Sequence, residues 1–183
     1  MKYLDVYSFP KIFIEHENLH SGNRRVVVLD GEDIIELVNI RDFHPKGKAR
    51  FFLQEVYEDA LNQIIDLERR VVKLSFIVYV PWHGKYMLIE RGTELDIIEV
   101  SGKQVFLLVR EGDLIHFNDK IATIITGKRE ARTFRSPANG VIVYISRILD
   151  ITTRDVYIVL VAEEGDVRAF EGRGKNNTEA CIN

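Results

Sequence analysis

The sequence contains a single cysteine, Cys181, together with one tryptophan and two methionines among its 183 residues. A lone cysteine excludes an intrachain disulfide and a zinc site built from cysteines. No apolar run approaches the roughly 18 residues that a membrane-spanning helix needs. The first five residues, Met1 to Asp5, show no start of the apolar segment of a signal peptide. These absences predict a cytoplasmic protein with no membrane association.

Neither sign of charge dominates, because 25 Lys and Arg residues against 28 Asp and Glu residues leave a formal net charge of -3. Nucleic-acid-binding proteins usually carry a basic excess, so we expect no nucleic-acid partner. Hydrophobic residues make up 46% of the chain and charged residues 29%, which is typical of a globular protein with a real core. Many charges of both signs and few methionines are also typical of proteins from thermophiles.

The first ninety residues combine strand patterns with one helical pattern. Residues 50–70 place apolar side chains at helical spacing, and this stripe predicts one long helix. Branched and aromatic residues predict strands at residues 11–14, 24–29, 34–40, 71–80 and 85–90. The sequence therefore predicts an α+β fold, mainly β, whose N-terminal antiparallel sheet packs against one long helix.

Four turn signals follow one another in the second half of the chain. They are Glu111-Gly112-Asp113, Asn118-Asp119, Thr126-Gly127-Lys128 and Asn139-Gly140, separated by short β-rich runs. Turns at intervals of about eight to ten residues predict a meander of short strands in a compact barrel or sandwich.

These residues resemble the biotinyl/lipoyl-attachment family, in which a Gly-Asp turn opens one repeat and a Pro-x-x-Gly turn leads into the next. Here the two turns are Glu111-Gly112-Asp113 and Pro137-Ala138-Asn139-Gly140. The resemblance implies a C-terminal barrel-sandwich hybrid. We therefore divide the chain into an α+β domain (1–90), a biotinyl/lipoyl-like domain (91–164) and a flexible tail (165–183). The whole chain is also similar to an uncharacterised archaeal family.

Carriers of the biotinyl/lipoyl family hold biotin or lipoate on a lysine at a hairpin apex. Counted back from Gly140, that register falls on Arg129, and Lys128 lies one residue earlier. We therefore expect Lys128 to carry neither group, and we expect no cofactor. Lys128 stays the attachment residue in the alternative that the protein is a carrier. The neighbouring cations Arg129, Arg132 and Arg135 form a candidate anion-binding patch.

His16-Glu17-Asn18-Leu19-His20 matches the H-E-x-x-H pattern, in which two histidines on one helix bind zinc and the glutamate acts as a base. His16 and His20 are therefore candidate metal ligands. The segment follows a strand-like run and ends at Ser21-Gly22, so a polar loop is the simpler interpretation.

The function predicted from these patterns is a non-enzymatic binding or assembly module whose lipoyl-like domain lacks a functional attachment lysine. We expect a protein partner or a homo-oligomer, because both halves contain edge strands. Two alternatives stay open: a zinc-dependent hydrolase using His16, Glu17 and His20, and a biotin or lipoate carrier modified on Lys128. A pocket between the two halves, lined by Trp82-His83-Gly84, is a further candidate site.

Overall fold

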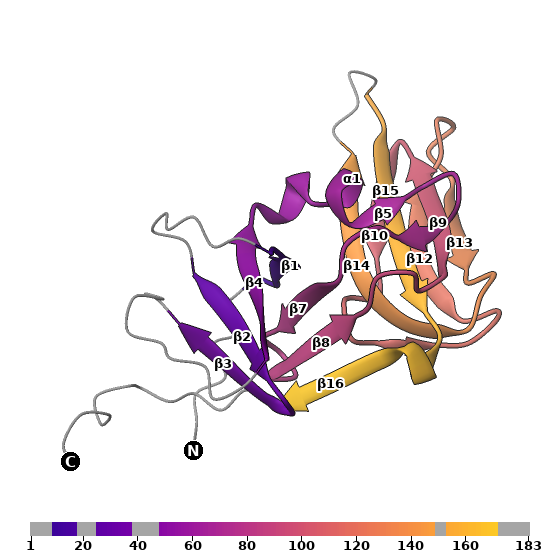
Figure 1. The fold of residues 1–183 in the computed structure, drawn as a ribbon. Helices are drawn as coiled ribbons and strands as arrows, with labels where there is room; N and C mark the ends of the chain where they lie inside the picture. Colours follow the sequence, from indigo (N-terminus) through magenta and orange to yellow (C-terminus); the bar gives the residue numbers. More distant parts are fainter. Residues whose placement is uncertain (1–8, 18–24, 38–47, 149–152, 172–183) are drawn as a thin grey trace, which may run out of the picture.

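The structure is a computed structural model that describes residues 9–17, 25–37, 48–148 and 153–171. The regular secondary structure in this part of the chain is almost entirely β-strand (Figure 1). The α-helix within these ranges, α1 (Leu61–Ile64), is a single turn, and it is accompanied by two 3-10 turns, η1 (Tyr57–Asp59) and η2 (Glu164–Asp166). None of these helices is long and apolar enough to cross a membrane.

The N-terminal half is built on one seven-stranded antiparallel sheet in the order β16-β8-β7-β1-β4-β2-β3. The two edge strands of this sheet meet at the bottom of the view in Figure 1, so the sheet curls into an open barrel. Phe13, Phe52 and Leu88 belong to the buried cluster inside it. The strands are β1 (Lys11–Glu15), β2 (Val26–Asp30), β3 (Asp33–Leu37), β4 (Ala49–Glu55), β7 (Phe76–Val80), β8 (Lys85–Ile89) and β16 (Val167–Glu171).

The long helix predicted for residues 50–70 is wrong, and with it the α+β fold class. The first part of this stretch is β4, which lies between β1 and β2 and is paired with both. Only η1, α1 and the short ribbon of β5 (Ile65–Asp66) and β6 (Val71–Val72) follow it. Val56 and Leu67, expected on the buried stripe, are 59% and 42% exposed. The strand pairing on both sides of β4 outweighs the helical spacing of its apolar residues. That spacing is a local property and contains no information about partner strands that are distant in the sequence.

The expected strand at residues 71–80 is divided. Its first two residues form β6, and its last five form β7 in the curled sheet. Between them the N–H of Lys73 donates to the carbonyl of Ile64 at 2.8 Å, which fastens the chain to α1. The expected strands at residues 11–14, 24–29, 34–40 and 85–90 correspond to β1, β2, β3 and β8, and residues 38–40 lie outside the described part of the chain.

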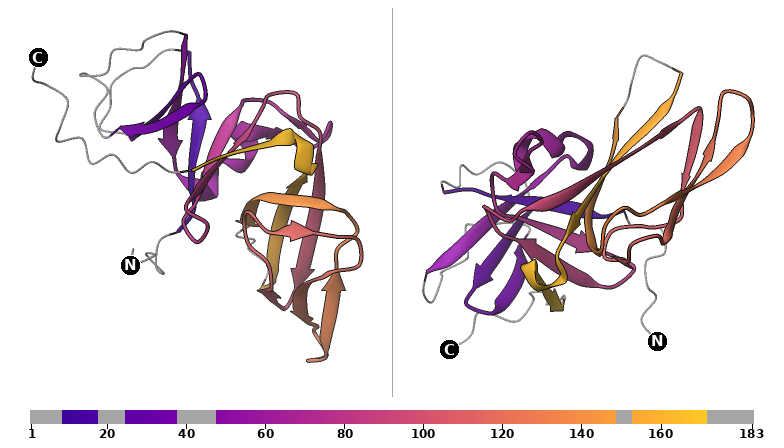
Figure 2. Two further views of the ribbon diagram at one scale, coloured as in Figure 1. Left: turned by 90° about the horizontal axis from the view of Figure 1, so that it is seen from below. Right: turned by 90° about the vertical axis from the view of Figure 1, so that its right-hand side faces the viewer.

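The C-terminal half consists of two facing antiparallel sheets with an apolar core between them (Figure 2). One sheet has the order β10-β12-β13 and the other the order β11-β14-β15-β9. The strands are β9 (Leu95–Gly102), β10 (Gln104–Leu107), β11 (Leu114–Ile115), β12 (Lys120–Ile125), β13 (Ala131–Arg135), β14 (Gly140–Ile148) and β15 (Asp155–Ala162).

The turns predicted in this half are confirmed. Gly112 has φ of 86°, and the Asp113 carboxylate accepts from the Arg110 N–H at 2.9 Å across the turn. Asn118 adopts φ of 73°, and the Asp119 carboxylate closes its turn by accepting from the His116 N–H at 2.8 Å. Asp and Asn side chains that bond nearby backbone groups are the physical basis of both signals.

The two halves share one core and one sheet. A single buried cluster contains Ile12 and Phe76 from the first half with Tyr144 and Leu160 from the second, so the two halves pack directly against each other. The segment expected to be a flexible tail from residue 165 instead begins with η2 and β16, and β16 pairs with β8. Residues 172–183 lie outside the described ranges, and the division at residue 90 stays a prediction.

Candidate functional site

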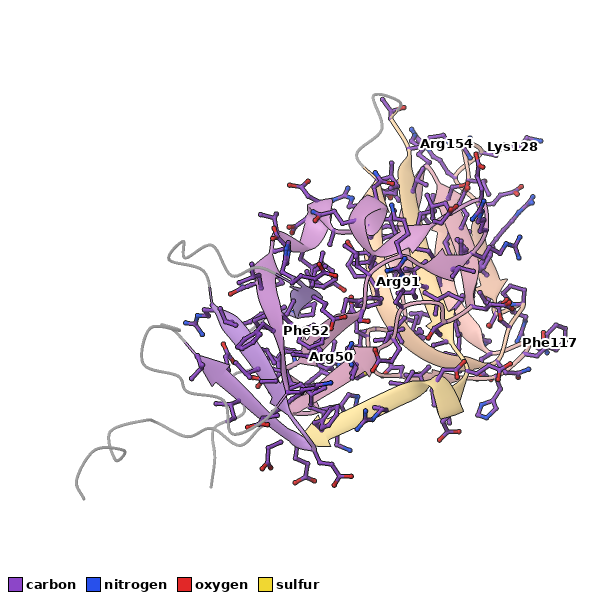
Figure 3. All side chains as sticks on the ribbon, viewed as in Figure 1. Arg50, Phe52, Arg91, Phe117, Lys128 and Arg154 are labelled. Carbon is purple, nitrogen blue, oxygen red and sulfur yellow. The ribbon has the colours of Figure 1, made fainter. Side chains whose placement is uncertain are left out.

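The hairpin formed by β12 and β13 is centred on Lys128, not on Arg129. Ile125 pairs with Ala131, so the residue midway between them is 128. The Thr126 N–H donates to the Glu130 carbonyl at 3.0 Å and the Arg129 N–H to the Thr126 carbonyl at 2.9 Å. The side chain of Lys128 is exposed at the upper end of the C-terminal half in Figure 3.

The predicted register, with Arg129 at the apex, is therefore wrong. Arg129 instead takes the left-handed position of the turn, with φ of 62°. The register of this hairpin does shift, but between Lys120 and Ala122 at the far end of β12. Counting residues back from Gly140 cannot reveal this bulge, because a bulge adds one residue to one strand only and so changes which residue lies at the apex.

The three-stranded sheet has one face against the core and one face toward solvent. Phe106, Thr123 and Thr133 form a row across its outer face, and Phe106 is 56% exposed. Val105, in the adjacent row, is buried in the core between the sheets. None of the residues of β10, β12 and β13 is acidic, whereas three are basic: Lys120, Arg132 and Arg135.

The arginines of the predicted anion patch lie along one hairpin and have different neighbours. Arg129 is in the apex loop, Arg132 contacts the Glu130 carboxylate at 3.0 Å, and Arg135 donates to the Asn118 carbonyl at 2.8 Å. Within the described ranges, no carboxylate contacts Arg129 or Arg135. The arginines follow the edge of the sheet instead of facing one point, and anion binding there stays a prediction.

Exposed apolar side chains gather in a short stretch that the sequence analysis did not single out. Phe106, Leu108, Leu114 and Phe117 are 56%, 56%, 49% and 68% exposed. The Leu108 N–H donates to the Ile121 carbonyl at the start of β12, and Phe117 lies in the turn that leads into β12. Figure 3 shows Phe117 projecting from the right-hand end of the molecule. The signal in the sequence was weak, because in β10 the buried Val105 and the exposed Phe106 are adjacent apolar residues.

A buried carboxyl joins the two halves at the turn between β10 and β11. The Tyr57 hydroxyl in η1 donates to Glu111 Oε1 at 2.6 Å, and Glu111 is 6% exposed. Trp82 Nε1 donates to the Glu111 carbonyl at 2.8 Å, and the Tyr144 hydroxyl donates to the Tyr57 carbonyl. The rings of Tyr57 and Tyr144 lie 4.7 Å apart.

Burial perturbs both members of the Tyr57–Glu111 pair. Burial raises the pKa of the Glu111 carboxyl above its usual 4.5, and the hydrogen bond from Tyr57 opposes part of that rise. Burial, and then the adjacent Glu111, raise the pKa of Tyr57 well above 10. In the described part of the chain no cationic side chain contacts the Glu111 carboxylate. The pair therefore acts as a hydrogen-bonded link between η1 and the 111–113 turn.

The predicted junction pocket is present as a groove of about 440 Å³ beside this link. His83 lines it from the first half, and its Nε2 lies 3.9 Å from Asp113 Oδ1 in the second. Trp82 and Gly84, which were also expected to line the pocket, are not part of the lining. Trp82 packs inward and carries Arg110 over its ring at 5.0 Å. Gly112 permits this approach, since a Cβ there would lie 2.9 Å from the His83 ring.

The H-E-x-x-H segment begins in extended structure. His16 directly follows β1, and its N–H donates to the Phe51 carbonyl at 3.0 Å. Its ring Nε2 lies 3.9 Å from Glu55. His20 lies outside the described residues, so the zinc prediction stays untested. In the ranges that the structure describes, no three His, Cys, Asp or Glu side chains are grouped so as to hold one metal ion.

Fold and surface together define an almost all-β protein, in which a curled seven-stranded sheet is joined to a two-sheet sandwich. The chain belongs to the family described as uncharacterized proteins conserved in archaea (DUF2118), whose model matches residues 7–164. It is also 26% identical over 162 residues to the uncharacterized protein MJ0859 of Methanocaldococcus jannaschii, covering 88% of this chain and 96% of that protein. The archaeal family resemblance is thereby confirmed, and the biotinyl/lipoyl resemblance stays a prediction.

Proposed function

We propose that this protein is a non-enzymatic binding or assembly module that contacts a protein partner through the C-terminal half. The observation that carries this proposal is the set of exposed apolar side chains between residues 106 and 117, with Phe117 the most exposed of them. Soluble proteins rarely present large apolar side chains together without a use for them. Exposed aromatic residues are also the usual anchors of protein interfaces.

The geometry around these side chains suits an interface. Leu108 and Phe117 lie at the same end of β12, and Leu114 lines the junction groove. The sheet beneath is held by the core between the two sheets, so the surface is presented by a rigid scaffold. We propose that the module works in the cytoplasm, in line with its single cysteine.

The test is recovery of the tagged full chain from its native cells, followed by mass spectrometry of whatever remains bound in fixed stoichiometry. We expect the partner to be lost with Phe117→Ser and Phe106→Ser. Val56→Ser is the matched control, because Val56 is 59% exposed on the other half and should not affect the complex. A partner retained by all three variants, or turnover of a substrate by the purified chain, would contradict the proposal.

A second candidate function is a carrier modified on Lys128, and the centring of the hairpin on this residue favours it. A swinging arm needs a lysine at the apex of a tight turn, where a ligase can reach it. The Glu111-Gly112-Asp113 turn before the hairpin and the Pro137-Ala138-Asn139-Gly140 turn after it add support from the sequence. Arg129 beside the lysine counts against a carrier, because it adds a second positive charge at the tip.

Peptide mass spectrometry decides between the two candidates. Protein taken from its native cells, or made beside biotin and lipoate ligases, is digested and the mass of the peptide containing Lys128 is measured. We expect the unmodified mass if the protein is only a binding module. A mass increase that maps to Lys128 and disappears in Lys128→Arg would establish the carrier.

A further inference from the structure

The third strand of the three-stranded sheet, β13, has a free edge. β13 pairs with β12 on one side, and no described strand pairs with it on the other. Four of its five residues are exposed and the fifth, Phe134, is half-buried. Figure 1 shows β13 at the outer right-hand edge of the molecule.

The backbone groups that point outward from this edge follow from the ladder. The Thr126 N–H donates to the Glu130 carbonyl at one end, and the Ser136 N–H donates to the Asp119 carbonyl at the other. Hydrogen-bonded and non-hydrogen-bonded pairs alternate along an antiparallel ladder. Residues 130, 132, 134 and 136 therefore face β12, and the N–H and C=O groups of residues 131, 133 and 135 face away from the sheet.

The other sheet edges in the described part of the protein differ from β13 in their contacts, burial or charge. At the long edge strand β9, four of the eight residues are buried, and the two exposed ones, Asp96 and Glu99, are acidic. The two edges of the curled sheet, β3 and β16, line one groove together. β10 presents the Val105 N–H, which is already bonded by the Asp155 carboxylate at 3.0 Å. At the start of β9, the Leu95 N–H donates to the Arg70 carbonyl at 2.9 Å. β13 therefore differs from these edges in offering outward-facing backbone groups at Ala131, Thr133 and Arg135 on a strand with four exposed residues.

The positive charge on and near β13 indicates which kind of segment can pair with its free edge. β13 carries Arg132 and Arg135 and no acid, and Lys120 pairs with Arg135 at its end. Lys128 and Arg129 add positive charge at the apex, where Glu130 is the single carboxylate. A second copy of this chain pairing edge to edge would bring the arginines of both strands together, which like-charge repulsion opposes.

We infer that the free edge of β13 is a docking strand for an extended, acidic segment of a partner protein. Addition of a strand to an exposed edge provides main-chain hydrogen bonds, and alternate side chains provide specificity. Carboxylates on the incoming strand would lie beside Arg135 on the outer face or Arg132 on the inner face. This inference rests on the proposed binding function and adds the chemistry of the partner.

A synthetic peptide tests this inference on the full-length chain. The probe is a blocked nine-residue peptide of alternating Val and Glu, and the control peptide has Lys in place of every Glu. We expect the acidic peptide to bind at least about tenfold more tightly and to lose affinity with added salt. Nuclear magnetic resonance should show the amides of Ala131, Thr133 and Arg135 shifted and protected from exchange.

Two variants at one position isolate the edge. Thr133→Pro removes an outward N–H without removing a bond to β12, so it should abolish peptide binding and leave the fold intact. Thr133→Val keeps the N–H and should bind the peptide as the natural chain does. Arg132→Glu with Arg135→Glu should weaken binding about tenfold or more, whereas Lys85→Glu, an exposed cation on β8, should not.

Three results would overturn the inference. The first is equal binding of the acidic and basic peptides, and the second is acidic-peptide binding that survives Thr133→Pro. The third is a single-stranded oligouridine that binds more tightly than the peptide and is unaffected by Thr133→Pro, because that would make the arginines a general polyanion surface. If Phe117→Ser abolishes binding of a natural partner and Thr133→Pro does not change it, the proposed binding function is retained and only the inference about the β13 edge is rejected.

Discussion

Removal of the Tyr57 hydroxyl tests the link between the two halves. Tyr57→Phe keeps the ring that lies against Tyr144 and deletes the donor to Glu111 Oε1, which lies 2.6 Å away. A hydrogen bond to a charged group contributes about 1.5 to 3 kcal/mol, and a buried carboxylate that loses one of its donors adds a desolvation cost. We therefore expect Tyr57→Phe to lower the free energy of unfolding by about 2 to 3 kcal/mol at pH 7.

The effect should depend on pH, and its sign follows from the pKa of Glu111. Burial raises that pKa above the 4.5 of an unfolded chain, so the carboxyl favours the folded state most when it is protonated. Its contribution to stability is fully present below pH 4.5 and is lost as the pH rises through the folded-state pKa. The hydrogen bond from Tyr57 is charge-assisted only above that pKa. The cost of Tyr57→Phe should therefore grow as the pH rises.

Glu111→Gln is the matched variant, because it removes the ionisation and keeps an acceptor for Tyr57. Its stability relative to the natural chain should rise with pH over the same interval. Combined with Tyr57→Phe, it should cost clearly less than the sum of the two single changes, because the two side chains interact directly.

Urea unfolding followed by tryptophan fluorescence measures all four proteins at pH 4 and pH 8. The chain has one tryptophan, and Trp82 bonds the Glu111 carbonyl, so the probe reports on this junction. Equal costs of Tyr57→Phe at the two pH values, together with additive single and double changes, would refute the role assigned to the pair.

Three further predictions concern the fold. Gly140→Ala should lower the free energy of unfolding, measured by thermal denaturation, by about 2 to 4 kcal/mol, since a Cβ at Gly140 would lie 2.2 Å from the Ala162 carbonyl at a φ of 142°. Gly127→Ala is the control, because a Cβ at Gly127 would have no neighbour within 4 Å. Equal losses of stability in the two variants would exclude the close approach as the cause. Arg50→Gln should cost about 1 to 2 kcal/mol at pH 7, because Arg50 bonds both Glu15 and Glu90 at 2.6 to 2.9 Å in a half-exposed site. The bonds to Arg50 lower the pKa of both carboxyls, so this stability is present above pH 4.5 and is lost as the pH falls through the lowered values; a cost that stays constant in acid would contradict it. Phe52→Ala should cost about 3 to 5 kcal/mol in urea unfolding and Val56→Ala less than about 0.5, whereas a helix over residues 50–70 would bury both side chains.

The candidate surfaces could be predicted only in part. Lys128 was identified from its place between two turn signals, but its place at the apex depends on the strand pairing. The exposed edge of β13 could not be predicted, because an edge is defined by the absence of a neighbour. Phe106 and Val105 are adjacent apolar residues, and only the packing of the two sheets decides that one is exposed and the other buried.

The sequence by itself determined the turns and most of the strands, because these depend on neighbouring residues. Gly112 and Asn118 tolerate positive φ, and the Asp side chains beside them bond the local backbone whatever the rest of the chain does. The tertiary structure alone decided that residues 49–55 are a strand, since β1 and β2 satisfy the backbone of β4 from both sides. It also decided that β16 returns to β8 in the first half. Hydrogen bonds between strands distant along the chain outweigh a local helical period, and no stretch of sequence read alone contains both partners.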